Sequence, residues 1–243
     1  MINNTTTSFS DDLDYKNGTT SDKEFNEILA QIGDQHVGTS YDTPIREDAF
    51  DLSDDEKMAK ISAHFKEIMQ ILGLDLADDS LAGTPNRVAK MYVKEIFGGL
   101  NPANKPDVRL FENKYEYHDM LVEKDITFFS TCEHHFVPIY GKVHVAYIPG
   151  DQVVGLSKIN RLVQYYAKRP QVQERLTTQI AHELKTLLKT EDVAVVVEAD
   201  HMCVASRGVQ DTNSSTTTSM YLGKFKEDTM RTEFFRHIGA PRS

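Results

Sequence analysis

The sequence contains only two cysteines among its 243 residues, and its hydrophobic runs are all short. A membrane-spanning helix needs roughly 20 consecutive apolar residues, so we expect no membrane partner. The first residues also lack the basic region and apolar stretch of a secretory signal peptide, which predicts a cytoplasmic protein. Because cysteines stay reduced in that compartment, the two thiols favour metal binding or catalysis over a disulfide.

Basic side chains are outnumbered, with 27 lysines and arginines against 37 aspartates and glutamates. The acidic excess lies at the start of the chain, where residues 1–56 hold 14 acidic and 3 basic side chains. The rest of the chain holds 23 acidic and 24 basic side chains and is therefore nearly neutral. A nucleic-acid-binding protein would concentrate basic side chains on one face, so we expect no nucleic-acid partner.

Composition and periodicity divide the chain into three regions. Residues 1–52 are acidic and rich in Asn, Thr, Ser, Asp and Gly, and we expect this extension to be largely disordered. The spacing of apolar residues favours one short helix in it, over residues 22–32. Residues 53–118 form a predicted helical region. Residues 119–243 contain both cysteines and form the predicted catalytic domain.

Two helix starts stand out in the helical region. Ser53 and Glu56 have the spacing of a capping box, in which the two side chains satisfy each other's backbone amides. Gly73 is a suitable stop for the helix that follows. Thr84 and Pro85 are typical of a second start, with threonine as the cap and proline as the first helical residue.

The hydrophobic period changes after residue 120 from that of helices to that of strands. The alternation is imperfect over residues 121–129 and regular over the second segment, and a β-branched run and a threonine-rich run follow later. The predicted strands cover residues 121–129, 139–148, 193–199 and 215–225, and the predicted helices cover residues 156–168, 172–188 and 225–238. Strand pairs placed around a helix pair predict an α+β fold with a mainly antiparallel sheet.

Two short segments gather the metal-ligating side chains: Cys132-Glu133-His134-His135 and His201-Met202-Cys203. Zinc favours Cys sulfur and His nitrogen, and a catalytic zinc keeps three protein ligands and one position for water. In a regular strand alternate residues share a face, so Cys132 would pair with His134. Cys132 can pair with His135 only if the chain turns there, and the local pattern leaves both arrangements open.

Either pairing leaves an imidazole beside the metal that is not a ligand. This surplus indicates catalysis, because a structural zinc site is closed by four ligands and needs no further base. Two other interpretations remain at this level. The cysteines could be buried as small hydrophobic residues beside hydrogen-bonded histidines, or the site could be a closed structural zinc.

Five separated segments carry a resemblance to a known family: residues 83–92 (GTPNRVAKMY), 132–135 (CEHH), 155–161 (GLSKINR), 169–176 (RPQVQERL), and 201–203 (HMC) with 207–209 (RGV). In this order they resemble GTP cyclohydrolase I, from about residue 53 to residue 237. The acidic extension takes no part in the resemblance. No motif position departs from the family pattern.

The resemblance implies a tunnelling fold, an antiparallel sheet with two helices packed on it. It also implies a toroidal homodecamer, a dimer of pentamers with active sites at subunit interfaces. Members of the family hydrolyse the guanine imidazole ring of GTP at C8, release formate and form 7,8-dihydroneopterin triphosphate. This reaction is the first step of tetrahydrofolate and pterin biosynthesis.

The resemblance also implies the ligand set and the proton-transfer groups. The family's zinc ligands fall on Cys132, His135 and Cys203, which selects the turned arrangement. His134 and His201 are then the catalytic imidazoles, with His134 as the acid that protonates N7 of guanine and His201 assisting later steps. Glu133 could orient a metal ligand or lie only in a subunit contact, and we do not include it among the catalytic residues.

The family pattern assigns the remaining polar motif residues to substrate. Ser157 matches the family's catalytic serine near the ribose, although the local pattern alone fits a helix cap equally well. Glu174, with Gln173 beside it, matches the acceptor for guanine N1–H and the 2-amino group. The triphosphate is assigned to cations that would otherwise be ordinary surface charges: Arg87, Lys158, Arg161 and Arg207.

Two functional alternatives deserve a test. One is a pterin- or deazaguanine-handling relative such as the nitrile reductase of queuosine biosynthesis, which uses a cysteine nucleophile and no zinc triad. The other is a non-catalytic binding module with a structural zinc. The Cys132, His135 and Cys203 set argues against the first, and the non-ligating His134 and His201 argue against the second.

Overall fold

A computed structural model of the chain describes residues 40–239. The chain divides into two units, Met1–Ser40 and Tyr41–Ser243, and the architecture below is that of the second. The short helix expected over residues 22–32 lies outside the described residues. None of the helices within residues 40–239 has both the length and the apolar character needed to cross a membrane.

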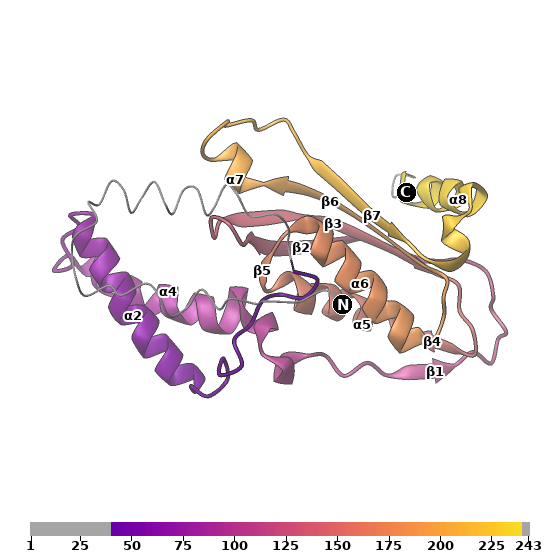
Figure 1. The fold of residues 1–243 in the computed structure, drawn as a ribbon, viewed down its shortest axis with the longest axis horizontal. Helices are drawn as coiled ribbons and strands as arrows, with labels where there is room; N and C mark the ends of the chain where they lie inside the picture. Colours follow the sequence, from indigo (N-terminus) through magenta and orange to yellow (C-terminus); the bar gives the residue numbers. More distant parts are fainter. Residues whose placement is uncertain (1–39, 240–243) are drawn as a thin grey trace, which may run out of the picture. The chain divides into compact units, whose positions relative to one another are not determined.

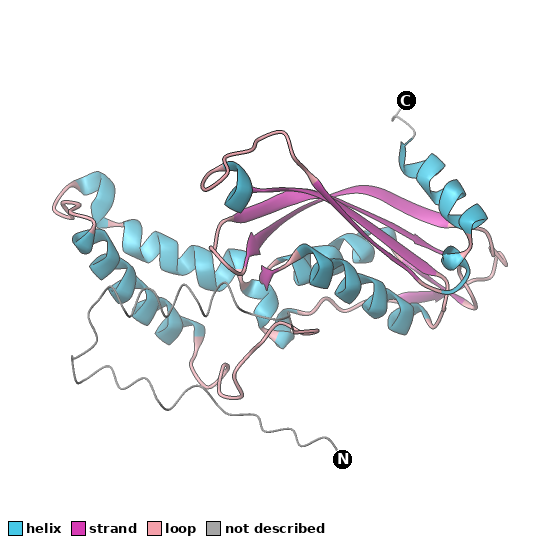
Figure 2. Cartoon of the chain, turned by 45° about the horizontal axis from the view of Figure 1, so that its top comes forward, coloured by secondary structure: helices cyan, strands magenta, loops and turns pink. Residues whose placement is uncertain are grey.

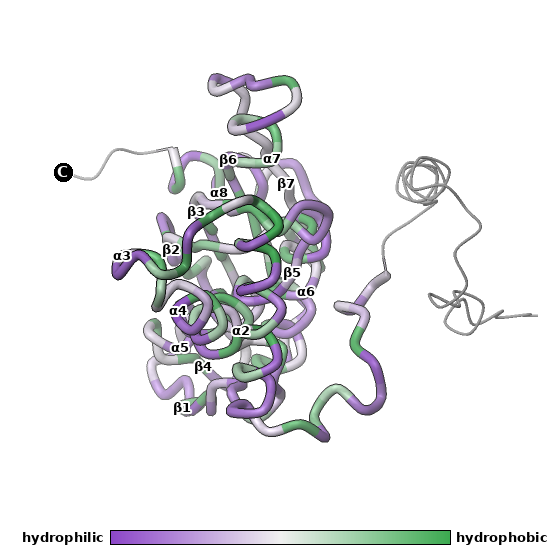
Figure 3. The backbone as a smooth tube through the Cα atoms, turned by 90° about the vertical axis from the view of Figure 1, so that its left-hand side faces the viewer, coloured by the Kyte–Doolittle hydropathy of each residue, from purple (hydrophilic) through white to green (hydrophobic). Residues whose placement is uncertain are grey.

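The capping box at the start of the helical region is confirmed. Helix α2 (Asp54–Ile71) begins at Ser53, whose hydroxyl accepts from the Glu56 amide while the Glu56 carboxylate accepts from the Ser53 amide at 2.8 Å. The helix ends at Ile71, and Gly73 just beyond it has a φ of 81°, a left-handed conformation that glycine adopts without strain. Along α2 the tube in Figure 3 alternates between hydrophilic and hydrophobic residues, as an amphipathic helix does.

The second helix starts one residue earlier than expected. Helix α4 (Thr84–Lys90) has Gly83 as its N-cap, so Thr84 is already helical, and it follows the short helix α3 (Asp79–Ala82). It continues as a π-helix over Met91–Ile96 and a 3-10 turn over Gly98–Leu100. Helices α2 and α4 pack against each other (Figure 1).

The predicted α+β architecture with a mainly antiparallel sheet is confirmed. Five strands in the order β5-β2-β3-β6-β7 form the sheet, and only the β5–β2 pair is parallel. Their bounds are β2 Leu121–Cys132, β3 Pro138–Tyr147, β5 Pro170–Gln171, β6 Val193–His201 and β7 Thr216–Tyr221. Two strands that the sequence pattern did not predict, β1 (Leu110–Glu112) and β4 (Gln152–Val154), form a separate ribbon.

Helices α5 (Leu156–Ala167) and α6 (Gln173–Leu188) cover one face of the sheet (Figure 2). The main core lies between them, where Phe128, Val143 and Val195 meet Leu162 and Ile180. A smaller core on the other face packs Ala146, Ala194 and Val196 against the last helix, α8 (Asp228–Gly239). The sheet therefore positions its strand ends rigidly, and the predicted metal ligands lie at or beside those ends.

A β-bulge explains the imperfect alternation in the first predicted strand. The register between β2 and β3 shifts between Glu123 and Ile126, and Asp125 adopts a φ of 59°. The Asp125 amide donates at 3.2 Å to Nδ1 of the His144 side chain on the neighbouring strand β3. A buried imidazole thus accepts a hydrogen bond from the backbone at the bulge.

His144 predicts a pH dependence of stability. It is 3% exposed, and burial lowers its pKa below the ordinary 6.5, although the carboxylates of Glu198 and Asp125 oppose this and Lys142 adds to it. Below pH 6.5 the unfolded chain therefore binds more protons, and stability is lost as the pH falls, by at most about 1.4 kcal/mol per pH unit.

Urea unfolding of the wild type and His144→Gln between pH 5 and 8, roughly the range in which histidine titrates, measures this effect. The glutamine amide can accept from Asp125 but does not titrate, so its stability should change less over the acidic half of the range. Equal slopes for the two proteins would contradict the prediction.

Candidate metal centre

The first cysteine lies where β2 ends and the chain turns. The Cys132 amide donates to the Val137 carbonyl at 2.8 Å, and the Phe136 amide donates to the Cys132 carbonyl at 2.9 Å. Phe136 has a φ of 54°, which reverses the chain direction within four residues. His135 is brought back towards Cys132 by this turn, so the segment is not a regular strand.

The second cysteine follows the end of β6. His201 is the last residue of the strand, and Cys203 lies in the first turn of the short helix α7 (Met202–Ala205). β6 pairs with β3, which begins directly after the Cys132 turn, with Ile139 opposite His201. The sheet therefore brings the two motifs together although they lie far apart in sequence.

Cys132, His135 and Cys203 form the one cluster of potential metal ligands found among the described residues. One ligand atom from each, two sulfurs and one imidazole nitrogen, lies within 4.8 Å of the others. Burial and the neighbouring Cys132 thiol raise the pKa of Cys203, and the Arg207 guanidinium opposes this change. The donor set of two thiols and one imidazole suits zinc and matches a three-ligand catalytic site.

His134 lies beside this cluster. Its Nδ1 is 3.8 Å from Cys132 Sγ, and its Nε2 is 3.9 Å from Oε1 of Glu133. The side chain is 44% exposed, so a substrate can reach it. His134 is therefore close to the predicted ligands and is separate from the Cys132, His135 and Cys203 cluster.

The structure gives Glu133 a partner that the sequence did not indicate. Its carboxylate accepts two hydrogen bonds from the Arg175 guanidinium, at 2.6 and 3.2 Å, and Arg175 is only 3% exposed. The Glu133 amide also donates to the Gln171 carbonyl of β5 at 3.1 Å. The turn that carries His134 and His135 is thus fastened to the start of α6 and to β5.

His201 contacts the first residue of α6. Its Nε2 lies 2.7 Å from Oε1 of Gln173. Burial lowers the pKa of His201, while the carboxylates of Glu174 and Asp200 oppose that change. Glu174, the predicted guanine acceptor, is exposed, and its charge acts on the predicted catalytic imidazole of His201.

Among the described residues, one of the predicted triphosphate cations hydrogen-bonds to a predicted metal ligand. Arg207 contacts the cluster, with Nη1 at 2.7 Å from Nε2 of His135. Lys158 donates to the Asp107 carbonyl, and Arg87 is exposed on α4. In the described part of the chain no hydrogen bond or ion pair joins Arg87, Lys158 or Arg161 to the metal ligands.

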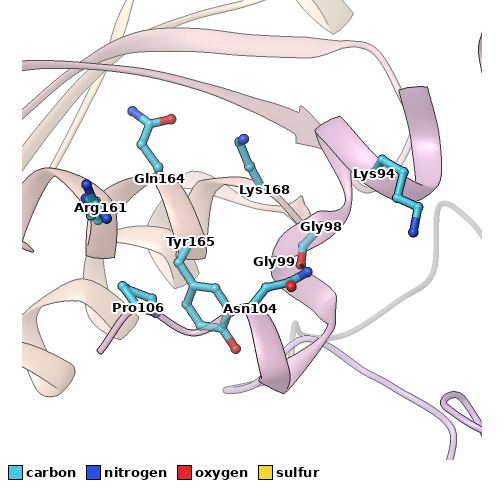
Figure 4. A pocket seen from close by; sticks show the side chains of 9 residues that line it. All are labelled: Lys94, Gly98, Gly99, Asn104, Pro106, Arg161, Gln164, Tyr165 and Lys168. Carbon is cyan, nitrogen blue, oxygen red and sulfur yellow. Dashed lines mark hydrogen bonds between the residues drawn. The ribbon is translucent and has the colours of Figure 1, made fainter. Parts of the chain in front are cut away.

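Arg161 instead lines a cavity of about 410 Å³. Figure 4 shows it with Gln164 on α5 and with Lys168 just after that helix, and Lys94 on another segment borders the same space. Lys94 is already paired with Asp54. Ser157 is the second residue of α5 and is exposed, and Gly155 is the N-cap, so the helix-cap interpretation of Ser157 is wrong.

Comparisons with known proteins agree on one family. A family model described as GTP cyclohydrolase I matches residues 61–239. The chain is 58% identical over 212 residues to "GTP cyclohydrolase 1" of Flavobacterium johnsoniae, covering 87% of this chain and 95% of that protein. It is 52% identical over 210 residues to "GTP cyclohydrolase 1" of Salmonella arizonae, covering 86% and 95%.

One solved structure is a weaker match. The crystal structure of the archaeosine synthase QueF-Like in the apo form has a TM-score of 0.35 and 18% sequence identity, over 44% of this chain and 94% of that chain. At this similarity neither fold nor function transfers.

Proposed function

The chain belongs to the GTP cyclohydrolase I family of hydrolases, and from that premise we propose that it is a zinc-dependent GTP cyclohydrolase I of the cytoplasm. It would hydrolyse GTP at C8, release formate and form 7,8-dihydroneopterin triphosphate. The observation that carries the proposal is the convergence of Cys132, His135 and Cys203 beside two further imidazoles. Such an arrangement suits catalysis better than a closed structural site.

Cys132, His135 and Cys203 would hold the zinc ion. When bound in a three-ligand site, zinc lowers the pKa of a water molecule to about 7 and acts as a Lewis acid. The fit rests on the donor types and on ligand atoms that already lie within 4.8 Å of one another. The Arg175–Glu133 pair would keep the turn that supplies His135 in this arrangement.

His134 and His201 would move the protons. C8 of guanine is a poor electrophile, and protonation of N7 makes it more reactive. His134 is exposed beside the cluster and would donate this proton, because an imidazole changes charge near neutral pH. His201 would serve the later proton transfers.

Glu174 would accept from guanine N1–H and the 2-amino group, close to His201. Ser157 would lie near the ribose, and Arg87, Lys158, Arg161 and Arg207 would bind the triphosphate. Among the described residues only Arg207 hydrogen-bonds to a predicted zinc ligand, and the resemblance to the family implies active sites at subunit interfaces. We therefore also propose the tunnelling fold and a toroidal homodecamer, a dimer of pentamers.

Incubation of the purified protein with GTP and zinc tests the function. We expect stoichiometric formate and a pterin that fluoresces after oxidation, and a chelator should suppress both. An assay of NADPH oxidation with a nitrile substrate tests the reductase alternative in parallel. If the zinc-loaded protein forms no product from GTP, the proposed function is wrong.

A further inference from the structure

Both the nitrogen and the oxygen of the Gln173 side-chain amide form hydrogen bonds within the chain. It is the first residue of α6 and is 2% exposed. Its Nε2 donates to the Val197 carbonyl of β6 at 3.0 Å and to the Thr216 carbonyl of β7 at 2.9 Å. Its Oε1 faces Nε2 of His201 at 2.7 Å. One side chain thus joins the start of α6 to both β6 and β7, beside the candidate metal centre.

These contacts determine where the proton of His201 lies. A backbone carbonyl can only accept, so both hydrogens of the amide nitrogen are used and its orientation is fixed. The amide oxygen can also only accept, so Nε2 of His201 must carry a hydrogen. In the neutral ring Nδ1 is then the unprotonated nitrogen.

Nδ1 of His201 is available for proton transfer. In the described part of the chain its ring makes one hydrogen bond, the Nε2 contact with Gln173. β6 ends at His201, and the predicted ligand Cys203 follows two residues later. A fixed hydrogen bond to one imidazole nitrogen holds both the ring orientation and the tautomer, as the buried aspartate does in serine proteases.

We propose that Gln173 is a positioning residue that holds His201 as the Nε2–H tautomer and so presents Nδ1 to the substrate as a proton acceptor. The proposal rests on the proposed function, and it replaces the expectation that the Gln173 side chain contacts guanine. Both amide hydrogens are already used, and the side chain is almost fully buried.

A double-mutant cycle separates positioning from simple anchoring of α6. In the zinc-loaded wild-type background, Gln173→Met should lower kcat roughly 10- to 100-fold, the range for partners that orient a histidine at a metal site, with the metal retained and KM little changed. In a His201→Ala background the same substitution should have no further effect on kcat.

Thr177→Val is the matched control. Thr177 lies one turn along α6, is equally buried, and its hydroxyl is 2.6 Å from that of Thr218 on β7. This variant loosens the same contact between α6 and β7 without touching His201, so its kcat should stay at the wild-type value. An equal loss of kcat from Gln173→Met in both backgrounds, or no loss in either, would overturn the proposal.

Magic-angle-spinning NMR of ¹⁵N-histidine-labelled holoenzyme gives a readout that does not depend on activity. The resonances lost in His201→Ala should report a protonated Nε2 and a bare Nδ1 in the wild type, and mixed tautomers in Gln173→Met. A bare Nε2 in the wild type would overturn the proposal whatever the activity. Absence of formate release by the wild type would instead overturn only the proposed function.

Discussion

Replacing Cys203 with serine should remove the metal ion and reduce formate release from GTP below detection. A serine hydroxyl is a poor zinc ligand at neutral pH, and the site would keep only Cys132 and His135. Cys132→Ser and His135→Ala should behave in the same way, because each removes one of three converging donors. Metal content per chain, measured by mass spectrometry after gel filtration, and formate yield check the series.

His134→Ala is the contrasting variant in this series. It should retain the metal and lose about 10²- to 10⁴-fold in turnover, the usual contribution of a general acid or base. The difference arises because His134 lies beside the cluster rather than in it, with Nδ1 at 3.8 Å from Cys132 Sγ. Loss of the metal in His134→Ala, with retention in His135→Ala, would show that the ligand assignment is wrong.

Of the substitutions in this ion pair and its surface control, Glu133→Ala should cause the largest loss of folding stability. In Glu133→Ala the Arg175 guanidinium, which is 3% exposed, loses the carboxylate that binds it through two hydrogen bonds. Breaking a buried ion pair from one side costs about 3 to 5 kcal/mol. For a chain of this size that corresponds to a fall in melting temperature of roughly 6 to 20 °C. Differential scanning calorimetry measures it.

Arg175→Met should be the milder variant of this pair. It leaves the Glu133 carboxylate, which is 19% exposed and can turn towards water. Lys185→Met is the surface control, since it breaks the Lys185–Glu191 pair, whose side chains are 36% and 72% exposed. Exposed pairs contribute about 1 kcal/mol or less. A Glu133→Ala protein as stable as the Lys185→Met control would contradict the prediction.

The parts of the fold that could be predicted are those determined by interactions between residues a few positions apart in the sequence. Ser53 and Glu56 are three residues apart, and their capping box forms as the sequence indicates. The regular alternation of the second predicted strand likewise matches β3, because each side chain must lie on one face or the other. Such patterns indicate the local conformational preference of the chain. Packing in the core then stabilises the preferred conformation.

Other features depend on partners that no local pattern identifies. The two-residue strand β5 exists only because Pro170 and Gln171 pair with the end of β2. The bulge at Asp125 is stabilised by His144 from the neighbouring strand, so the sequence showed only a broken alternation. The ion pair between Arg175 and Glu133 could not be predicted from the sequence, because no local motif or spacing relates these two residues.

The four residues from Cys132 to His135 contain features of both kinds. By itself the sequence determined the donor types, the short list of ligands and the surplus of imidazoles. A regular strand would have paired Cys132 with His134, and the local pattern allowed it. In the tertiary structure the chain turns instead, which brings His135 close to Cys132. Glu133 binds Arg175, and Cys203 completes the cluster of ligands. The physical reason is that donor chemistry belongs to single residues, whereas the meeting of distant donors depends on strand pairing and burial across the whole sheet.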